Sequence, residues 1–181
     1  MLIQNYGLFW RRNQIEGEVD GMWPRTGKLL GIGVRRKREK PVDFAAQRGI
    51  YALYDDNFRL VYVGQAGKGK TGLYKRLRSH TITNLSQRWS RFSWFGIRPV
   101  SPTEGQDGYR QLIDVSEVVE TSPAAILDHI EAVLIMAGEP LRNTKGGNFG
   151  EGVHYRQVPL RQQSGEVEAD NSEYYDDEDA A

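Results

Sequence analysis

Two short runs of β-forming residues, separated by a polar turn, constrain the fold of this chain most. The first run spans residues 48–54 and the second spans residues 59–64, and Asp55, Asp56 and Asn57 between them are typical turn residues. Strand-like runs joined by a short polar turn predict a β-hairpin. A glycine-rich loop, residues 64–72, follows the second run.

Downstream of the hairpin the sequence predicts a basic helix, a third strand and a longer helix. Residues 73–83 place Leu73, Tyr74 and Leu77 on one side of a helix, and residues 91–97 are aromatic and apolar as in a strand. Ser122 followed by Pro123 is a typical helix start, and Gly138 and Pro140 are expected to end that helix. The spacing of six apolar residues predicts the side that faces the core: Ile126, Leu127, Ile130, Val133, Leu134 and Ala137.

The charges are segregated along the chain. Of 24 acidic residues, eight lie in residues 165–181, which contain no lysine or arginine, so the rest of the chain carries a net charge of +8. A basic body with an acidic tail indicates a surface for a polyanion, although for the tail alone an aid to solubility is the favoured explanation. Because the chain has no cysteine, disulfides and thiolate metal sites are excluded.

The sequence has neither the long apolar run of a signal peptide nor the roughly 20 apolar residues of a membrane-spanning helix. We therefore expect a cytoplasmic, soluble protein without a membrane partner.

Residues 64–71 match the phosphate-binding P-loop pattern GxxxxGK[ST], in which Lys70 would contact the terminal phosphates and Thr71 a magnesium ion. A P-loop fold requires a parallel sheet, whereas the run before this loop is expected in an antiparallel hairpin. The acidic residue that should end a later apolar strand has only Asp114 as a candidate, after a very short run. We therefore keep a P-loop NTPase as an alternative and interpret the segment as a basic loop near a phosphate backbone.

A second set of residues points to hydrolysis of a phosphodiester. That reaction must deprotonate a water, stabilise a pentacovalent phosphate and neutralise the leaving oxygen. A tyrosine or histidine can deprotonate the water, an arginine can stabilise the phosphate, and a metal bound to a carboxylate can neutralise the leaving oxygen. Arg76 and His80 are spaced i, i+4 and therefore share one face of the predicted helix. Together these elements resemble the GIY-YIG nuclease family over about residues 47–150: Gly49-Ile50-Tyr51, Tyr62-Val63-Gly64, Arg76, His80, Glu131 and Asn143.

The resemblance implies a metal-dependent DNA endonuclease that leaves 5′-phosphate and 3′-hydroxyl ends. Glu131 would bind one Mg²⁺ (or Mn²⁺) per active site, and Arg76 would stabilise the pentacovalent phosphate. Tyr51 would orient or deprotonate the attacking water, with His80 and Tyr62 assisting, and which of them is the base stays open. Two glycines and an asparagine would have structural roles at this site: Gly49, Gly64 and Asn143.

Double-stranded DNA is the expected partner. Basic residues around the expected site are candidates for phosphate contacts: Lys68, Lys70, Lys75, Arg78, Arg88 and Arg91. One site cuts one strand, so double-strand cleavage would need a homodimer or two visits. Restriction or defence against mobile elements would suit such a nuclease. A DNA-binding module with an inactive site is a further alternative.

These observations predict an α/β (α+β) fold with a small three-stranded antiparallel sheet flanked by helices. We expect a β-rich N-terminal extension over residues 1–46, a GIY-YIG-like nuclease domain over residues 47–162 and an acidic, disordered tail over residues 163–181.

Overall fold

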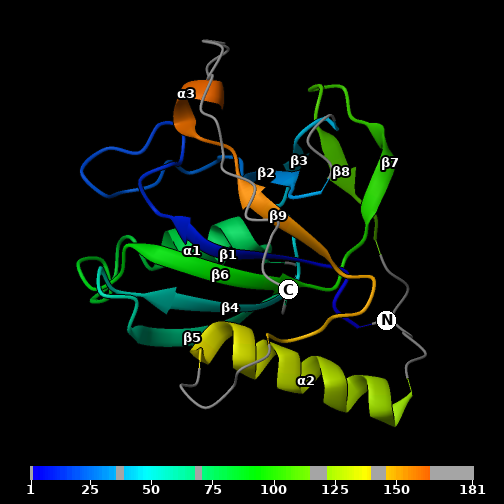
Figure 1. The fold of residues 1–181 in the computed structure, drawn as a ribbon. Coiled ribbons are helices and arrows are strands. Elements are labelled where there is room, and N and C mark those ends of the chain that lie inside the picture. Colours follow the sequence, from blue (N-terminus) through cyan, green and yellow to red (C-terminus); the bar gives the residue numbers. More distant parts are fainter. Residues whose placement is uncertain (1, 36–38, 68–70, 115–121, 140–145, 164–181) are drawn as a thin grey trace, which may run out of the picture.

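The computed structural model describes residues 2–35, 39–67, 71–114, 122–139 and 146–163 (Figure 1). Asn143, Lys68, Lys70 and nearly all of the acidic tail lie outside the described residues. Within these ranges the chain forms nine strands and three helices in the order β1 (Asn5–Arg11), β2 (Leu30–Gly33), β3 (Val42–Asp43), β4 (Gly49–Tyr54), β5 (Leu60–Ala66), α1 (Leu73–Ser79), β6 (Arg91–Gly96), β7 (Val100–Glu104), β8 (Arg110–Leu112), α2 (Pro123–Gly138), β9 (Val153–Gln157) and α3 (Leu160–Gln163).

All nine strands belong to one mixed sheet, in the order β5-β4-β6-β1-β9-β2-β3-β8-β7. The pairs β1–β9 and β3–β8 are parallel, and the other neighbours are antiparallel. The prediction of a small three-stranded antiparallel sheet is therefore wrong. The three strands expected from the sequence are present as β5, β4 and β6 and pair antiparallel, but they make up only one end of the sheet.

The larger sheet has a physical cause at β6. This strand is buried along most of its length, so an unpaired edge would leave backbone N–H and C=O groups without partners. Strand β1 supplies those partners by pairing antiparallel with β6, from Asn5 opposite Gly96 to Arg11 opposite Arg91. The N-terminal segment thus contributes β1, β2 and β3 to the same sheet as the hairpin. The domain boundary expected after residue 46 stays a prediction.

Successive strand residues point to opposite faces of the sheet, and each face has its own core. On one face Tyr51, Leu53 and Trp94 pack with Leu73 and Leu77 of α1. On the other face Phe95 packs with Ala132 of α2, and the Tyr54 hydroxyl donates to the carbonyl of Ala137 at 2.7 Å. Helices α1 and α2 therefore cover opposite faces, with α1 behind the strands and α2 below them in Figure 1.

Helix α2 begins as predicted but turns a different side to the sheet. Ser122 caps it by accepting from the backbone N–H of Ala125 at 3.3 Å, and Pro123 is its first residue. Its buried residues are His129 and Ala132, whereas Leu127 is 67% and Leu134 65% exposed.

The predicted core stripe of α2 is therefore wrong for four of its six residues, since Ile126 and Ile130 are also exposed, at 37% and 49%. The helix is apolar nearly all round, so spacing alone does not select the buried side. The small Ala132 packs with Phe95 of the sheet. Nδ1 of His129 accepts a hydrogen bond from the backbone N–H of Ile3 at 3.3 Å. No helix in the described ranges is long and apolar enough to cross a membrane.

Candidate active site

Tyr51 and His80 form the centre of the site. Tyr51 lies in β4 with none of its surface exposed, and its hydroxyl is 2.8 Å from Nε2 of His80. His80 is the residue that ends α1, where its backbone N–H donates to the carbonyl of Leu77. The indole N–H of Trp89 donates to the His80 carbonyl at 3.3 Å, so the histidine is held through both its backbone and its ring.

Gly49 and Gly64, the glycines of the two tripeptides, lie where another part of the chain comes too close for a side chain. Gly64 lies opposite Tyr51 in the β4–β5 pairing, and a Cβ at Gly64 would be 2.5 Å from both Cζ and the hydroxyl of Tyr51. Gly49 has φ +149°, a region that L side chains rarely adopt, and a Cβ there would be 2.0 Å from the carbonyl oxygen of Phe95. Gly64 therefore lets the Tyr51 ring lie across β5, and Gly49 lets β4 approach β6.

Tyr62 and Arg76 complete the cluster from β5 and α1. The Tyr62 ring centroid is 4.7 Å from that of His80 and 6.1 Å from that of Tyr51. Nε of Arg76 donates to the carbonyl of Gln65 at 3.1 Å, which holds the guanidinium beside β5, the edge strand of the sheet. Arg76 is exposed and Tyr62 and His80 are partly exposed, so these three side chains are the ones that a substrate could contact.

The environment sets the protonation of the central pair. Burial raises the pKa of Tyr51 to about 12, with a further rise from Tyr62 and an opposing effect of the Arg76 charge. Burial and the nearby Arg76 lower the pKa of His80. At neutral pH Tyr51 is therefore a protonated hydroxyl and His80 a neutral imidazole that can accept a proton.

Glu131 does not join this cluster. It is exposed on α2, which packs on the sheet face opposite to Tyr51, and it lies on the outward side of that helix with Leu127 and Leu134. Within the described ranges no three or more His, Asp or Glu side chains gather in a way that could hold a metal ion. These residues therefore do not fit a divalent metal held by Glu131 beside Tyr51.

The expected phosphate contacts are only partly at the site. Lys75 and Arg88 are exposed, whereas Nε of Arg78 donates to the carbonyls of Trp23 and Pro24 and so ties α1 to the N-terminal segment. Arg91 lies at the start of β6 with its guanidinium 4.5 Å from the ring centroid of Phe58. Arg78 is thus a packing residue, and Arg91 lies at the far end of the strand pair from Gly49.

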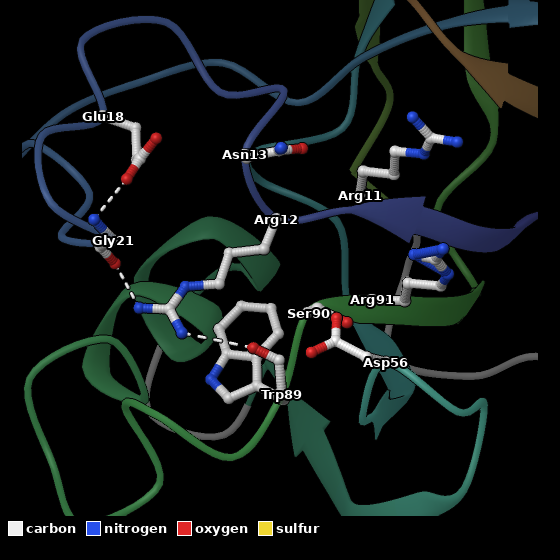
Figure 2. A pocket seen from close by; sticks show the side chains of 9 residues that line it. All are labelled: Arg11, Arg12, Asn13, Glu18, Gly21, Asp56, Trp89, Ser90 and Arg91. Carbon is white, nitrogen blue, oxygen red and sulfur yellow. Dashed lines mark hydrogen bonds between the residues drawn. The ribbon is translucent and has the colours of Figure 1, made fainter.

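The sequence reasoning missed two features of the site. One is Trp89, whose indole N–H supports the carbonyl of His80. Arg11 and Arg12, at the end of β1, line a pocket with Arg91 (Figure 2). Two adjacent arginines directly after an apolar run were the signal that could have drawn attention to this pocket.

Known proteins offer no further guide to the site. No protein-family model, curated protein or solved structure matches this chain.

Proposed function

We propose that this protein is a DNA endonuclease that hydrolyses phosphodiester bonds with the cluster of Tyr51, Tyr62, Arg76 and His80. The observation that carries the proposal is the Tyr51–His80 pair at 2.8 Å, with an exposed arginine beside it at the edge of the sheet. Tyr51 lies on β4, Tyr62 on β5, and Arg76 and His80 at the end of α1. The fold brings these side chains together on one face of the sheet. The net charge of +8 outside the acidic tail favours a polyanionic substrate.

His80 is the base in this proposal, and Tyr51 is a positioning residue. Tyr51 is fully buried, so water does not reach its hydroxyl, whereas the His80 ring is partly exposed. With Nε2–H donating to Tyr51, Nδ1 of neutral His80 accepts the proton of the attacking water. In this assignment Tyr51 orients the His80 ring, whereas the family resemblance implies that it orients or deprotonates the attacking water.

Arg76 and Tyr62 act on the phosphate. As the water oxygen bonds to phosphorus, negative charge grows on the equatorial oxygens, and the guanidinium of Arg76 stabilises it. The bond from phosphorus to the 3′ oxygen then breaks, and Tyr62 donates its proton to that oxygen. The His80 imidazolium returns a proton to Tyr62, whose ring lies 4.7 Å away, and the products are 5′-phosphate and 3′-hydroxyl ends.

A nicking assay on supercoiled plasmid tests the proposal. Arg76→Ala should slow nicking about 10²–10³-fold, the usual cost of losing one group that stabilises a developing oxyanion. His80→Ala should slow it by about 10²–10⁴-fold, as expected for a general base. Arg59→Ala removes one exposed positive charge from the opposite end of the hairpin and serves as the control. Unchanged nicking by His80→Ala protein would refute the assignment.

The orientation of Glu131 favours a second candidate, a DNA-binding module without cleavage. If the family resemblance extends only to the fold of the hairpin and α1, the chain would bind DNA without nicking it. Running the same assay in Mg²⁺, in Mn²⁺ and in EDTA separates the two candidates. Retention on DNA without nicking under every condition would support the binding module, and cleavage that survives Glu131→Ala but not His80→Ala would support the nuclease.

A further inference from the structure

A pocket of about 410 Å³ lies at the other end of the strands from Gly49. It forms where β1 ends, β6 begins and the turn between β4 and β5 comes close. Figure 2 shows Arg12 reaching across Trp89 on one side of the pocket and Arg11 and Arg91 on the other.

Arg12 is a buried cation with a fixed position. It is only 8% exposed, and its guanidinium donates to the carbonyls of Gly21, Ser86 and Trp89 and lies 4.7 Å from the Trp89 ring centroid. Its neighbour Glu18 already accepts from the backbone N–H of Gly21. The hydrogen bonds of the guanidinium are all to neutral carbonyls, and burial lowers the pKa of Arg12 more than the charge of Glu18 raises it. The desolvation of this buried charge is therefore only partly offset.

Two buried polar atoms of the pocket residues have no hydrogen-bond partner. They are Nε of Arg12 and the hydroxyl oxygen of Ser90. The Ser90 backbone is itself held on both sides, since its N–H donates to the Tyr54 carbonyl and its carbonyl accepts from the Arg12 N–H. Buried donors of this kind usually have a partner, and a ligand with acceptor oxygens would supply one here.

The remaining lining residues indicate a phosphate. Arg91 stacks one face of its guanidinium on Phe58, which leaves the N–H groups at its edge available. In the described part of the chain, no carboxylate forms a salt bridge with Arg11 or Arg91. Asp56, on the rim, is the group that opposes an anion. The pocket has three arginines and two carboxylates, Asp56 on the rim and Glu18, which already accepts from Gly21. This excess of positive charge favours an anion that only accepts hydrogen bonds over a neutral ligand.

The pocket is connected to the Tyr51–His80 pair. Trp89 lies under the Arg12 guanidinium and donates to the His80 carbonyl. Arg91 is opposite Tyr54 in the β4–β6 pairing, so its side chain leaves the sheet on the face of Tyr54, opposite to that of Tyr51. Trp89 is therefore the contact that links the pocket to the cluster.

We propose that the pocket of Arg11, Arg12 and Arg91 binds a backbone phosphate of the DNA on which the Tyr51–His80 cluster acts. The inference rests on the proposed function, because it takes DNA as the substrate. It adds a second contact with the DNA backbone, where β1 ends and β6 begins.

The test measures binding separately from cleavage. A labelled DNA duplex is titrated in EDTA and followed by fluorescence anisotropy over a series of salt concentrations. Arg11→Gln with Arg91→Gln should weaken binding about tenfold, the usual effect of losing charge-assisted hydrogen bonds. The same double variant should lower the slope of log affinity against log salt by about 0.9, the value for one phosphate contact. Arg12 is left intact because its carbonyl contacts hold the fold.

Two charge controls sharpen the result. Arg59→Gln removes an exposed charge just beyond the same turn without touching the pocket, and its affinity should stay within about twofold of the wild type. Asp56→Asn removes the opposing rim charge and should tighten binding. An unchanged affinity and slope in the double variant, or weaker binding by Asp56→Asn protein, would overturn the proposal.

Inorganic phosphate distinguishes a strand site from a site for a free anion. Phosphate is titrated while the Nε–H resonance of Arg12 is followed by NMR, with and without a DNA duplex present. Displacement of phosphate by the duplex supports the strand site, and phosphate binding that DNA does not affect overturns it. DNA binding that depends on the pocket in a protein that never nicks would refute the nuclease function and leave the phosphate site standing.

Discussion

Replacing Gly64 with alanine tests whether the Tyr51 ring lies across β5 as the structure has it. The added Cβ would be 2.5 Å from Cζ and the hydroxyl of Tyr51, whereas ordinary contacts begin at 3.4 Å, so the ring or the strand must move by about 1 Å. Tyr51 has no exposed surface and packs within the larger core, so that movement is resisted on every side.

The cost follows from three contributions. Overpacking of this kind costs about 1–3 kcal/mol, and weakening the 2.8 Å contact with His80 adds about 1 kcal/mol. Alanine in a strand recovers about 0.5–1 kcal/mol relative to glycine. The free energy of unfolding should therefore fall by about 2 kcal/mol, which moves the urea midpoint by about 1 M for a slope of about 2 kcal/mol/M.

Two further variants make this prediction specific. Gly138→Ala adds a Cβ that meets nothing within 4 Å at the end of α2, so it should be neutral or stabilising by up to about 1 kcal/mol. Tyr51→Phe removes one of the atoms that the new Cβ meets. The double variant Gly64→Ala/Tyr51→Phe should therefore be less destabilised than the sum of its parts, by about 1 kcal/mol. An unchanged midpoint for Gly64→Ala, or strict additivity in the cycle, would refute the packing of Tyr51 over β5.

Further predictions concern the strands, the helices and the histidines. Gly49→Ala should cost at least about 3 kcal/mol in urea unfolding, since its Cβ would be 2.0 Å from the Phe95 carbonyl oxygen at a strained φ. Leu134→Ala, at a 65% exposed position, should cost under about 0.5 kcal/mol, whereas Leu77→Ala at a fully buried one should cost about 2–5 kcal/mol; equal losses would contradict the orientation of α2. Burial lowers the pKa of all three histidines, so stability should be full above the unfolded pKa of about 6.5 and decline as the pH falls toward the lowered folded values. Urea unfolding at several pH values should show a shallower decline for His80→Gln, and an identical decline would exclude a buried neutral His80.

Within the cluster, one side chain is enclosed and positions its neighbour, and the other three are accessible from solvent. Tyr51 is enclosed and holds the His80 ring, while Arg76, Tyr62 and His80 present surface at the edge strand β5. An edge strand has one open side, so an extended polyanion can approach these side chains without displacing another strand.

Local features of the site could be predicted from the sequence. The hairpin of β4 and β5 follows from two β-rich runs around a polar turn, and the proximity of Arg76 and His80 follows from their spacing on α1. The Ser122 cap and Pro123 likewise mark the start of α2. Each of these features depends on residues within a few positions of one another, where dihedral preferences and helical periodicity act directly.

Long-range features were decided only by the tertiary structure. The pairing of β1 with β6 turned an expected three-stranded sheet into one end of a nine-stranded sheet, because the buried edge of β6 needs hydrogen-bond partners that no local pattern identifies. The orientation of α2 was decided by packing of Ala132 and His129 against the sheet, which turned Glu131 away from Tyr51. A helix that is apolar on two sides contains no information about which side will find a partner. The sequence by itself therefore determined the hairpin and the residues of the cluster, and the packing of distant segments determined which of the expected site residues meet.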